Sequence, residues 1–386
     1  MALPAGRERA LLPVAACRTS REHPRVGRRR RRRGGDEPWY DELEVEEVAG
    51  ELVYVAGRTE AGFAFGPPLA EVREEMEREH HGAGWARAKR ALREVLEREG
   101  IGIRDIDRVT KIGDGLSRDV YGANVTHADG SEQAYAMLVP RRDADAELTE
   151  RTLGEVRLLS TLRERRLPFR VPAVLGAVRE GREAILVRHF VRGVPLDLRA
   201  GRQPSVRPWE IVGAIAAAIH AIDGSEVADV TRGHATRREH ALDELAVLEG
   251  LELEEMRAAL AWAREHLPPD EPSVLVHGDL LGQNILLAFE GPHHVIDWEY
   301  ALRGDPAYDL AIVTRGAKQP FQIAGGLAKL LEAYEAHGGR GVLPEHVRIY
   351  ELCMTAFAYR EALAGRSSQS PEHELARMRG LVRRLT

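Results

Sequence analysis

The chain has 386 residues, of which 44% are apolar and 30% are charged, and its formal net charge is −6. This composition is typical of a soluble globular protein, and no stretch approaches the roughly 20 apolar residues of a membrane helix. The two cysteines, Cys17 and Cys353, lie far apart and form neither a disulfide framework nor a metal motif. We therefore expect a cytoplasmic protein without a membrane partner.

The N-terminal 35 residues differ from the rest of the chain in charge. Residues 1–35 contain eleven Arg and two Glu, a net charge of +9, so the remainder carries −15. A segment this polar cannot form a core, and we predict a disordered tail. We interpret it as a solvated tail or as sequence upstream of the true start, with a nucleic-acid-binding arm as the alternative. The acidic remainder suits a neutral or cationic small substrate better than nucleic acid.

The next elements follow from the periodicity of apolar residues. Residues 36–103 are an N-terminal extension of unknown role, with a short strand near Glu51 and a helix over 69–99. Shorter runs then predict three strands, at 109–112, 120–125 and 133–139. A helix at 148–162 and two further strands at 174–178 and 184–187 follow. After Gly193 the chain is mostly helical, and His220 is interpreted as a packed residue of a buried helix.

A polar loop interrupts two apolar runs, VLV and ILL, near residue 280. It contains Asp279 and Asn284, and Asp297 follows a second short strand. If the hairpin is centred between Glu290 and Gly291, Asn284 and Asp297 are cross-strand neighbours with Cβ atoms about 5 Å apart. An amide and a carboxylate oxygen can together bind Mg²⁺, and Asp279 can accept a proton from a hydroxyl nucleophile. Taken singly, each residue has a structural alternative as a turn or helix cap.

A glycine-rich turn lies between the first two predicted strands. It contains Gly113, Gly115 and Ser117, small residues that let backbone N–H groups approach phosphate oxygens. A dinucleotide-binding fold needs a helix directly after such a turn, and a Walker A loop needs Gly-Lys-Ser/Thr. Neither condition is met, so the strand–turn–strand order favours a kinase-type cover over a nucleotide. An ordinary hairpin turn is the alternative.

With these motifs in place, the chain from about residue 104 to 386 resembles the aminoglycoside phosphotransferase/choline kinase-like family, relatives of protein kinases. The resemblance rests on HGD followed by Asn at 277–284, IDW at 296–298 and GDPAYDLA at 304–311. It implies an α+β, protein-kinase-like two-lobed fold, with a β-rich N-lobe at 104–190 and a helical C-lobe at 191–386. It also implies an enzyme that transfers the γ-phosphoryl group of ATP to a hydroxyl of a small molecule, with Mg²⁺.

The resemblance assigns a role to each matching residue. Asp279 is the implied catalytic base, and Asn284 and Asp297 are the implied Mg²⁺ ligands. The residues implied to cover the phosphates are Gly113, Gly115 and Ser117. The implied hinge at the adenine is the backbone from His189 to Val191, and Glu155 is implied to pair with a cation on the third strand. His277 is expected to brace the loop, and Asp309 is expected to tie its own helix back to it.

One position departs from the family pattern. The family carries Arg or Lys two residues before the Pro that ends the third strand, and here Leu138 precedes Pro140 at that spacing. Arg141 and Arg142 follow the proline and are candidates to reach the phosphates instead. The departure supports a second interpretation, a weak or inactive pseudokinase that binds nucleotide or a partner.

Overall fold

The computed structural model describes most of the chain after residue 83 and four short strands before it. The described residues are 45–48, 51–54, 57–58, 64–65, 83–114, 117–141, 146–251 and 253–385. The predicted tail at 1–35, residues 69–82 of the first predicted helix, Arg142 and Gly115 lie outside them. Two compact units are formed, which we call the helical unit (Asp145–Gly176 and Arg188–Thr386) and the sheet unit (Ala177–Val187 and the described residues before Asp145).

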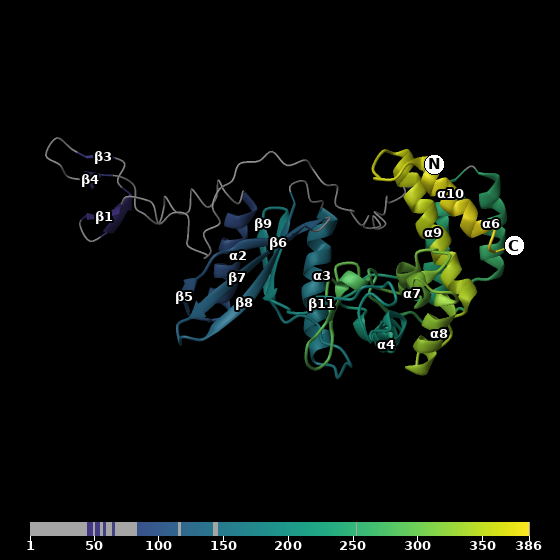
Figure 1. Ribbon diagram of the computed structural model, residues 1–386, viewed down its shortest axis with the longest axis horizontal. Helices are drawn as coiled ribbons and strands as arrows, with labels where there is room; N and C mark the ends of the chain where they lie inside the picture. The colour runs from purple at the N-terminus through teal and green to yellow at the C-terminus, as the bar shows by residue number, and fades with distance from the viewer. Residues whose placement is uncertain are drawn as a thin grey trace, which may run out of the picture. The chain divides into compact units, whose positions relative to one another are not determined.

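The sheet unit is built on one six-stranded sheet. Its strands follow the order β5-β7-β8-β10-β9, and β6 pairs with β7. Figure 1 shows this sheet in blue and teal. The strands are β5 (Ile103–Ile106), β6 (Thr110–Asp114), β7 (Arg118–His127), β8 (Glu132–Pro140), β9 (Val174–Glu180) and β10 (Glu183–His189). Five of them were predicted, and β5 was missed because two of its four residues are charged and exposed.

Helix α2 (Ala83–Arg98) packs against this sheet. Its buried residues Leu92 and Leu96 recur at the helical spacing that the sequence predicted, and Trp85 is buried on the same helix. The packing is close, because a Cβ atom added to Gly84 would lie 2.1 Å from the hydroxyl of Tyr121 on β7. The N-terminal extension therefore contributes a helix to the core of the sheet unit.

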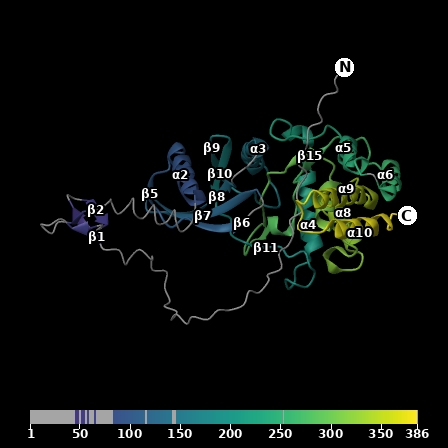
Figure 2. The same cartoon turned by 90° about the horizontal axis from the view of Figure 1, so that it is seen from above.

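The helical unit contains the other helices that the structure describes (Figure 2). They enclose two apolar cores. Its helices are α3 (Ala146–Arg163), α4 (Pro208–His220), η2 (Gly224–Val227), α5 (Arg237–Glu249), α6 (Glu254–Glu265), η3 (Gly282–Asn284), α7 (Ala307–Thr314), η4 (Pro320–Gln322), α8 (Gly326–Ala336), α9 (Pro344–Leu363) and α10 (Pro371–Val382). Helix α4 packs on α8, and α9 contacts α5, α7 and α10. Helix α3 clusters with this unit, whereas the predicted lobe boundary placed it in the N-lobe.

Two small sheets in the helical unit border the HGD and IDW motifs seen in the sequence. Strands β11 (Val194–Pro195), β13 (Ile285–Leu287) and β14 (His294–Val295) form one, and β12 (Val274–Val276) pairs with β15 (Leu302–Gly304) in the other.

The register of the β13–β14 hairpin corrects one prediction. Ile285 faces Val295, and the N–H of Ile296 donates to the carbonyl of Asn284 at 2.9 Å. Asn284 is therefore opposite Ile296, and its predicted pairing with Asp297 is wrong by one residue. The physical reason is the loop, which is centred on Glu290 and has an odd rather than an even number of residues.

The four short strands before α2 form two pairs. Strand β1 (Val45–Val48) pairs with β2 (Glu51–Tyr54), the strand predicted near Glu51, and β3 (Gly57–Arg58) pairs with β4 (Ala64–Phe65). Among the helices that the structure describes, none combines the length and the apolar composition needed to span a bilayer.

Candidate active site

The polar motif around residue 280 forms a tight loop, which we call the HGD loop (residues 277–284). It links β12 to β13 through η3. Gly278 adopts φ +80°, and a Cβ atom there would lie 2.2 Å from the carbonyl oxygen of Tyr300. Only glycine avoids both the backbone strain and this clash. The loop backbone is therefore fixed by a residue that has no side chain.

The carboxylate of Asp309 holds the start of the HGD loop. This residue of α7 is fully buried, and its two oxygens accept hydrogen bonds from the N–H of His277 at 2.8 Å and of Gly278 at 2.9 Å. His220 Nε2 lies 3.1 Å from the same carboxylate, and the Tyr334 hydroxyl lies 3.1 Å from His220 Nδ1. The expected tie from Asp309 is confirmed. The role of His220 was missed, because the residue is distant in sequence and its helix is apolar.

His277 braces the loop as the sequence suggested. Its Nε2 lies 3.1 Å from the carbonyl of Ile296, which can only accept, so Nε2 carries the hydrogen. Its Nδ1 then accepts from the N–H of Asp279 at 3.2 Å. Burial lowers the pKa of His277 to about 4, which keeps the imidazole neutral near pH 7. A neutral ring in this tautomer positions the backbone of Asp279.

Asp279 and Asn284 face each other across the loop. The Nδ2 amide of Asn284 donates to the main-chain oxygen of Asp279 at 2.8 Å and to its Oδ2 at 2.9 Å. Burial raises the pKa of Asp279 to about 6, although Asn284 and the charge of Arg315 act in the opposite direction. A carboxylate with this pKa is suited to take a proton near neutral pH.

Asn284 and Asp297 have the chemistry of a magnesium site. Both hydrogens of the Asn284 amide are directed to Asp279, so its Oδ1 is the atom able to bind a cation. Asp297 adopts φ +67° directly after the β13–β14 hairpin. Such left-handed backbone is uncommon outside glycine and concentrates at functional sites. The two oxygen donors fit a hard cation that takes few protein ligands, and their role as a pair stays a prediction.

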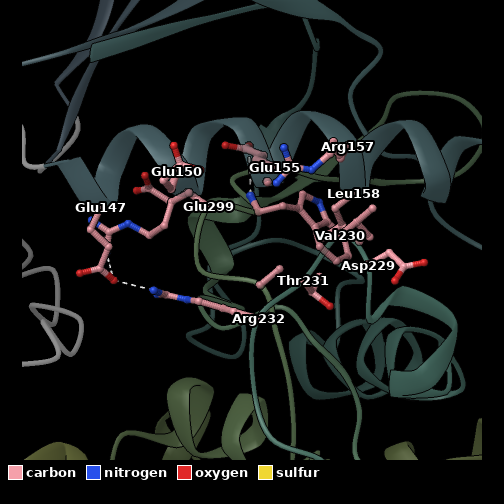
Figure 3. Close-up of a pocket in the computed structure, with 14 residues that line it drawn as sticks. Glu147, Glu150, Glu155, Arg157, Leu158, Asp229, Val230, Thr231, Arg232 and Glu299 are labelled. Carbon is pink, nitrogen blue, oxygen red and sulfur yellow. Dashed lines mark hydrogen bonds and ion pairs between the residues drawn. The ribbon is translucent and has the colours of Figure 1, made fainter. Parts of the chain in front are cut away.

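Glu155 is buried on α3 and contacts the segment after Asp297. Its Oε1 accepts a hydrogen bond from the N–H of Trp298 at 3.3 Å, and the Trp298 ring lies 4.5 Å from that of His277. Glu155 lines a cavity of about 340 Å³. Figure 3 shows it together with Glu299 and Arg232, two of the other lining residues. Glu155 thereby links α3 to the segment of the candidate metal ligand, a contact that the sequence did not indicate.

The other predicted residues are divided between the two units. Gly113 lies at an irregularity in the β6–β7 pairing, and Ser117 is half-buried directly before β7, both in the sheet unit. His189 and Val191 are half-buried at and after the end of β10, and the N–H of His189 donates to the carbonyl of Ala173 at 2.8 Å. Their proposed nucleotide contacts stay predictions.

Comparison with known proteins places this chain among phosphotransferases. The model of the phosphotransferase enzyme family matches residues 108–350. Macrolide 2'-phosphotransferase MphH from Brachybacterium faecium superposes with a TM-score of 0.52 at 24% identity, over 74% of this chain and 96% of its own. A thermostable mutant of aminoglycoside phosphotransferase APH(4)-Ia, in a ternary complex with AMP-PNP and hygromycin B, gives 0.51 at 18% identity, over 75% and 97%.

A sequence relative extends this comparison. Homoserine kinase from Rhizobium rhizogenes is 29% identical over 184 residues, which are 44% of this chain and 53% of the kinase. The chain thus spans about half the length of that relative. The solved structures show the protein-kinase-like fold that the motifs implied, and the match over residues 108–350 covers well over half of the sequence. The chain belongs to the phosphotransferase enzyme family.

Proposed function

We propose that this protein transfers the γ-phosphoryl group of ATP to a hydroxyl group of a small molecule, with Mg²⁺ as the cofactor. The observation that carries the proposal is Asp279, whose pKa is raised to about 6 and whose carboxylate is held by Asn284 in the HGD loop. Family membership supports phosphoryl transfer, and the ternary complex of APH(4)-Ia with AMP-PNP and hygromycin B supports the donor and acceptor classes.

The residues in and around the HGD loop are proposed to activate the acceptor hydroxyl. Asp279 accepts the proton of the attacking hydroxyl, whose oxygen forms the new bond to the γ-phosphorus while the bond to the bridging oxygen of ADP breaks. Asn284 and Asp297 would hold Mg²⁺, which neutralises phosphate charge when bound. Asp309 and His277 keep the Asp279 backbone in place. Catalysis then depends mainly on positioning, which favours a rigid loop.

The donor side of the proposal rests on predicted roles. We propose Gly113, Gly115 and Ser117 as phosphate-binding residues and the backbone of His189 and Val191 as the adenine contact. Glu155, which contacts the backbone of Trp298, is proposed to fix the segment next to Asp297. The assignments of the glycine-rich segment and of the hinge follow the family resemblance residue by residue. For Glu155 the resemblance implies a different role, as the partner of a cation on the third strand, and the role proposed here rests on its contact with Trp298.

A second candidate function is nucleotide binding without turnover. The observation that favours it is Leu138, which is buried on β8 at the position where the family carries a cation. Such a protein would bind ATP but release no ADP with any acceptor.

The deciding experiment measures ADP release from Mg²⁺-ATP with a panel of amino sugars, macrolides, amino alcohols including homoserine, and simple sugars. We expect at least one acceptor to stimulate turnover and Asp279→Asn to lower kcat by about 10²–10⁴-fold. Asp270→Asn, the same change at an exposed position of the helical unit, is the control and should leave kcat unchanged. Unchanged turnover in Asp279→Asn would show that Asp279 is not the base. ATP binding without turnover for the whole panel would favour the second candidate.

A further inference from the structure

Leu138 occupies the position on β8 at which the family carries an Arg or a Lys. Leu138 of β8 faces Val120 of β7, and Pro140 faces Arg118 two positions further along. Directly opposed residues of an antiparallel pair share one face, and so do residues two apart on a strand. Arg118 and Leu138 therefore lie on the same face as diagonal neighbours, with a separation of about 7–8 Å. A long guanidinium side chain can span that distance.

The opposite face of the same strands is already engaged. Tyr121 on that face lies against Gly84 of α2. Asp119 shares the face and binds two cations, Lys111 Nζ at 3.1 Å and Arg141 Nε at 2.9 Å. Both cations remain substantially exposed in these ion pairs. Arg141, one of the two arginines that follow Pro140, is thus drawn to Asp119 and away from the face of Leu138.

Arg118 lies close to the glycine-rich segment and carries a charge inside the fold. It is the first residue of β7, directly after Ser117, and only 3% of its surface is exposed. A guanidinium keeps its charge even when it is buried. Its planar fork of N–H donors also matches the oxygens of a phosphate group.

We propose that Arg118 binds the phosphate groups of the nucleotide and replaces the cation that is missing at Leu138. In this chain the phosphate-binding charge is carried by β7 instead of by the adjacent strand β8, on the same face of the sheet. The inference rests on the proposed function, since it assumes a nucleotide donor. It predicts that affinity for the phosphates, and not for the nucleoside, depends on Arg118.

The test compares the Kd of Mg²⁺-ATP with the Kd of adenosine by calorimetry on the full chain. Arg118→Met should weaken ATP binding about ten- to a hundredfold, the effect of losing charged hydrogen bonds, and leave adenosine binding unchanged. Arg118→Met combined with Leu138→Arg, which returns the cation to β8, should recover part of the ATP affinity. Arg93→Met, an exposed position on α2, is the matched control and should alter neither Kd.

Several outcomes decide between this inference and the proposed function. Equal ATP affinity in Arg118→Met and the wild type, or equal losses for ATP and adenosine, would overturn the role of Arg118 while turnover by the wild type still stands. If Arg118→Met does not fold, Arg118→Lys is measured instead, and a smaller but selective loss of ATP affinity supports the inference. A wild-type protein that binds no ATP would overturn both proposals.

Discussion

Replacing Asp309 by Asn removes one of the two carboxylate oxygens that hold the HGD loop. If the remaining oxygen takes the place of Oδ2, it still accepts from the N–H of His277 and from His220, but the amide nitrogen faces the N–H of Gly278. One buried N–H without a partner costs about 1–3 kcal/mol, and loss of charge assistance weakens the other two bonds by about 1 kcal/mol each. We expect Asp309→Asn to lower the free energy of unfolding by about 3–5 kcal/mol.

The same change should lower catalysis, because Asp279 follows the two anchored residues. A displacement of about 1 Å can reduce kcat roughly a hundredfold while KM for the nucleotide stays unchanged. The assays are urea unfolding and ADP release with the acceptor found in the panel. Asp305→Asn is the control, since Asp305 is equally buried but bonds to Arg237 and the N–H of Ala307. Asp305→Asn should lower the free energy of unfolding and leave kcat unchanged. Wild-type kcat or stability in Asp309→Asn would refute this account of the anchor.

Three further predictions concern the HGD loop. Ionisation of Asp279 opposes folding above its pKa of about 6. Asp279→Asn should therefore raise the unfolding free energy by about 1–3 kcal/mol at pH 8 in EDTA. Calorimetry should show that this gain disappears below pH 4. In the metal-free protein, a ¹³C NMR titration should find the pKa of Asp279 lowered by Glu299→Gln and raised by Arg315→Met, because the native charges act in the opposite senses. Gly278→Ala should abolish turnover and destabilise the protein by more than about 3 kcal/mol. Gly325→Ala, with φ +69° and no atom within 4 Å of the new Cβ, should cost only about 1 kcal/mol in thermal unfolding.

The sequence predicted most of the fold because its signals are local. Apolar periodicity located α2, α3 and five strands of the sheet, and the spacing of Asp279 and Asn284 located the HGD loop. The register of the β13–β14 hairpin was wrong by one residue, because it depends on whether the loop has an odd or an even number of residues. Strand β5 was missed because its pairing with β7, and not its composition, makes it a strand.

The contacts that support the candidate site could not be predicted in the same way. His220 and Asp309 are 89 residues apart, and Glu155 and Trp298 are 143 residues apart. Neither pair has a spacing signal, because only the packing of α3, α4 and α7 around the loop brings them together. The departure at Leu138 was visible in the sequence, but the position of Arg118 on the same face required the strand register.

Helix α2 sets a practical limit on where this protein can be divided. It precedes the family match at residues 108–350, yet Trp85, Leu92 and Leu96 are each at most 2% exposed. Burial of three such side chains contributes about 5–9 kcal/mol, which is comparable to the whole stability of an ordinary domain. An expression fragment trimmed to the recognisable homology would leave one side of the sheet open to water, and it should aggregate rather than report on the enzyme. The autonomous folding unit begins before the region by which the family is recognised.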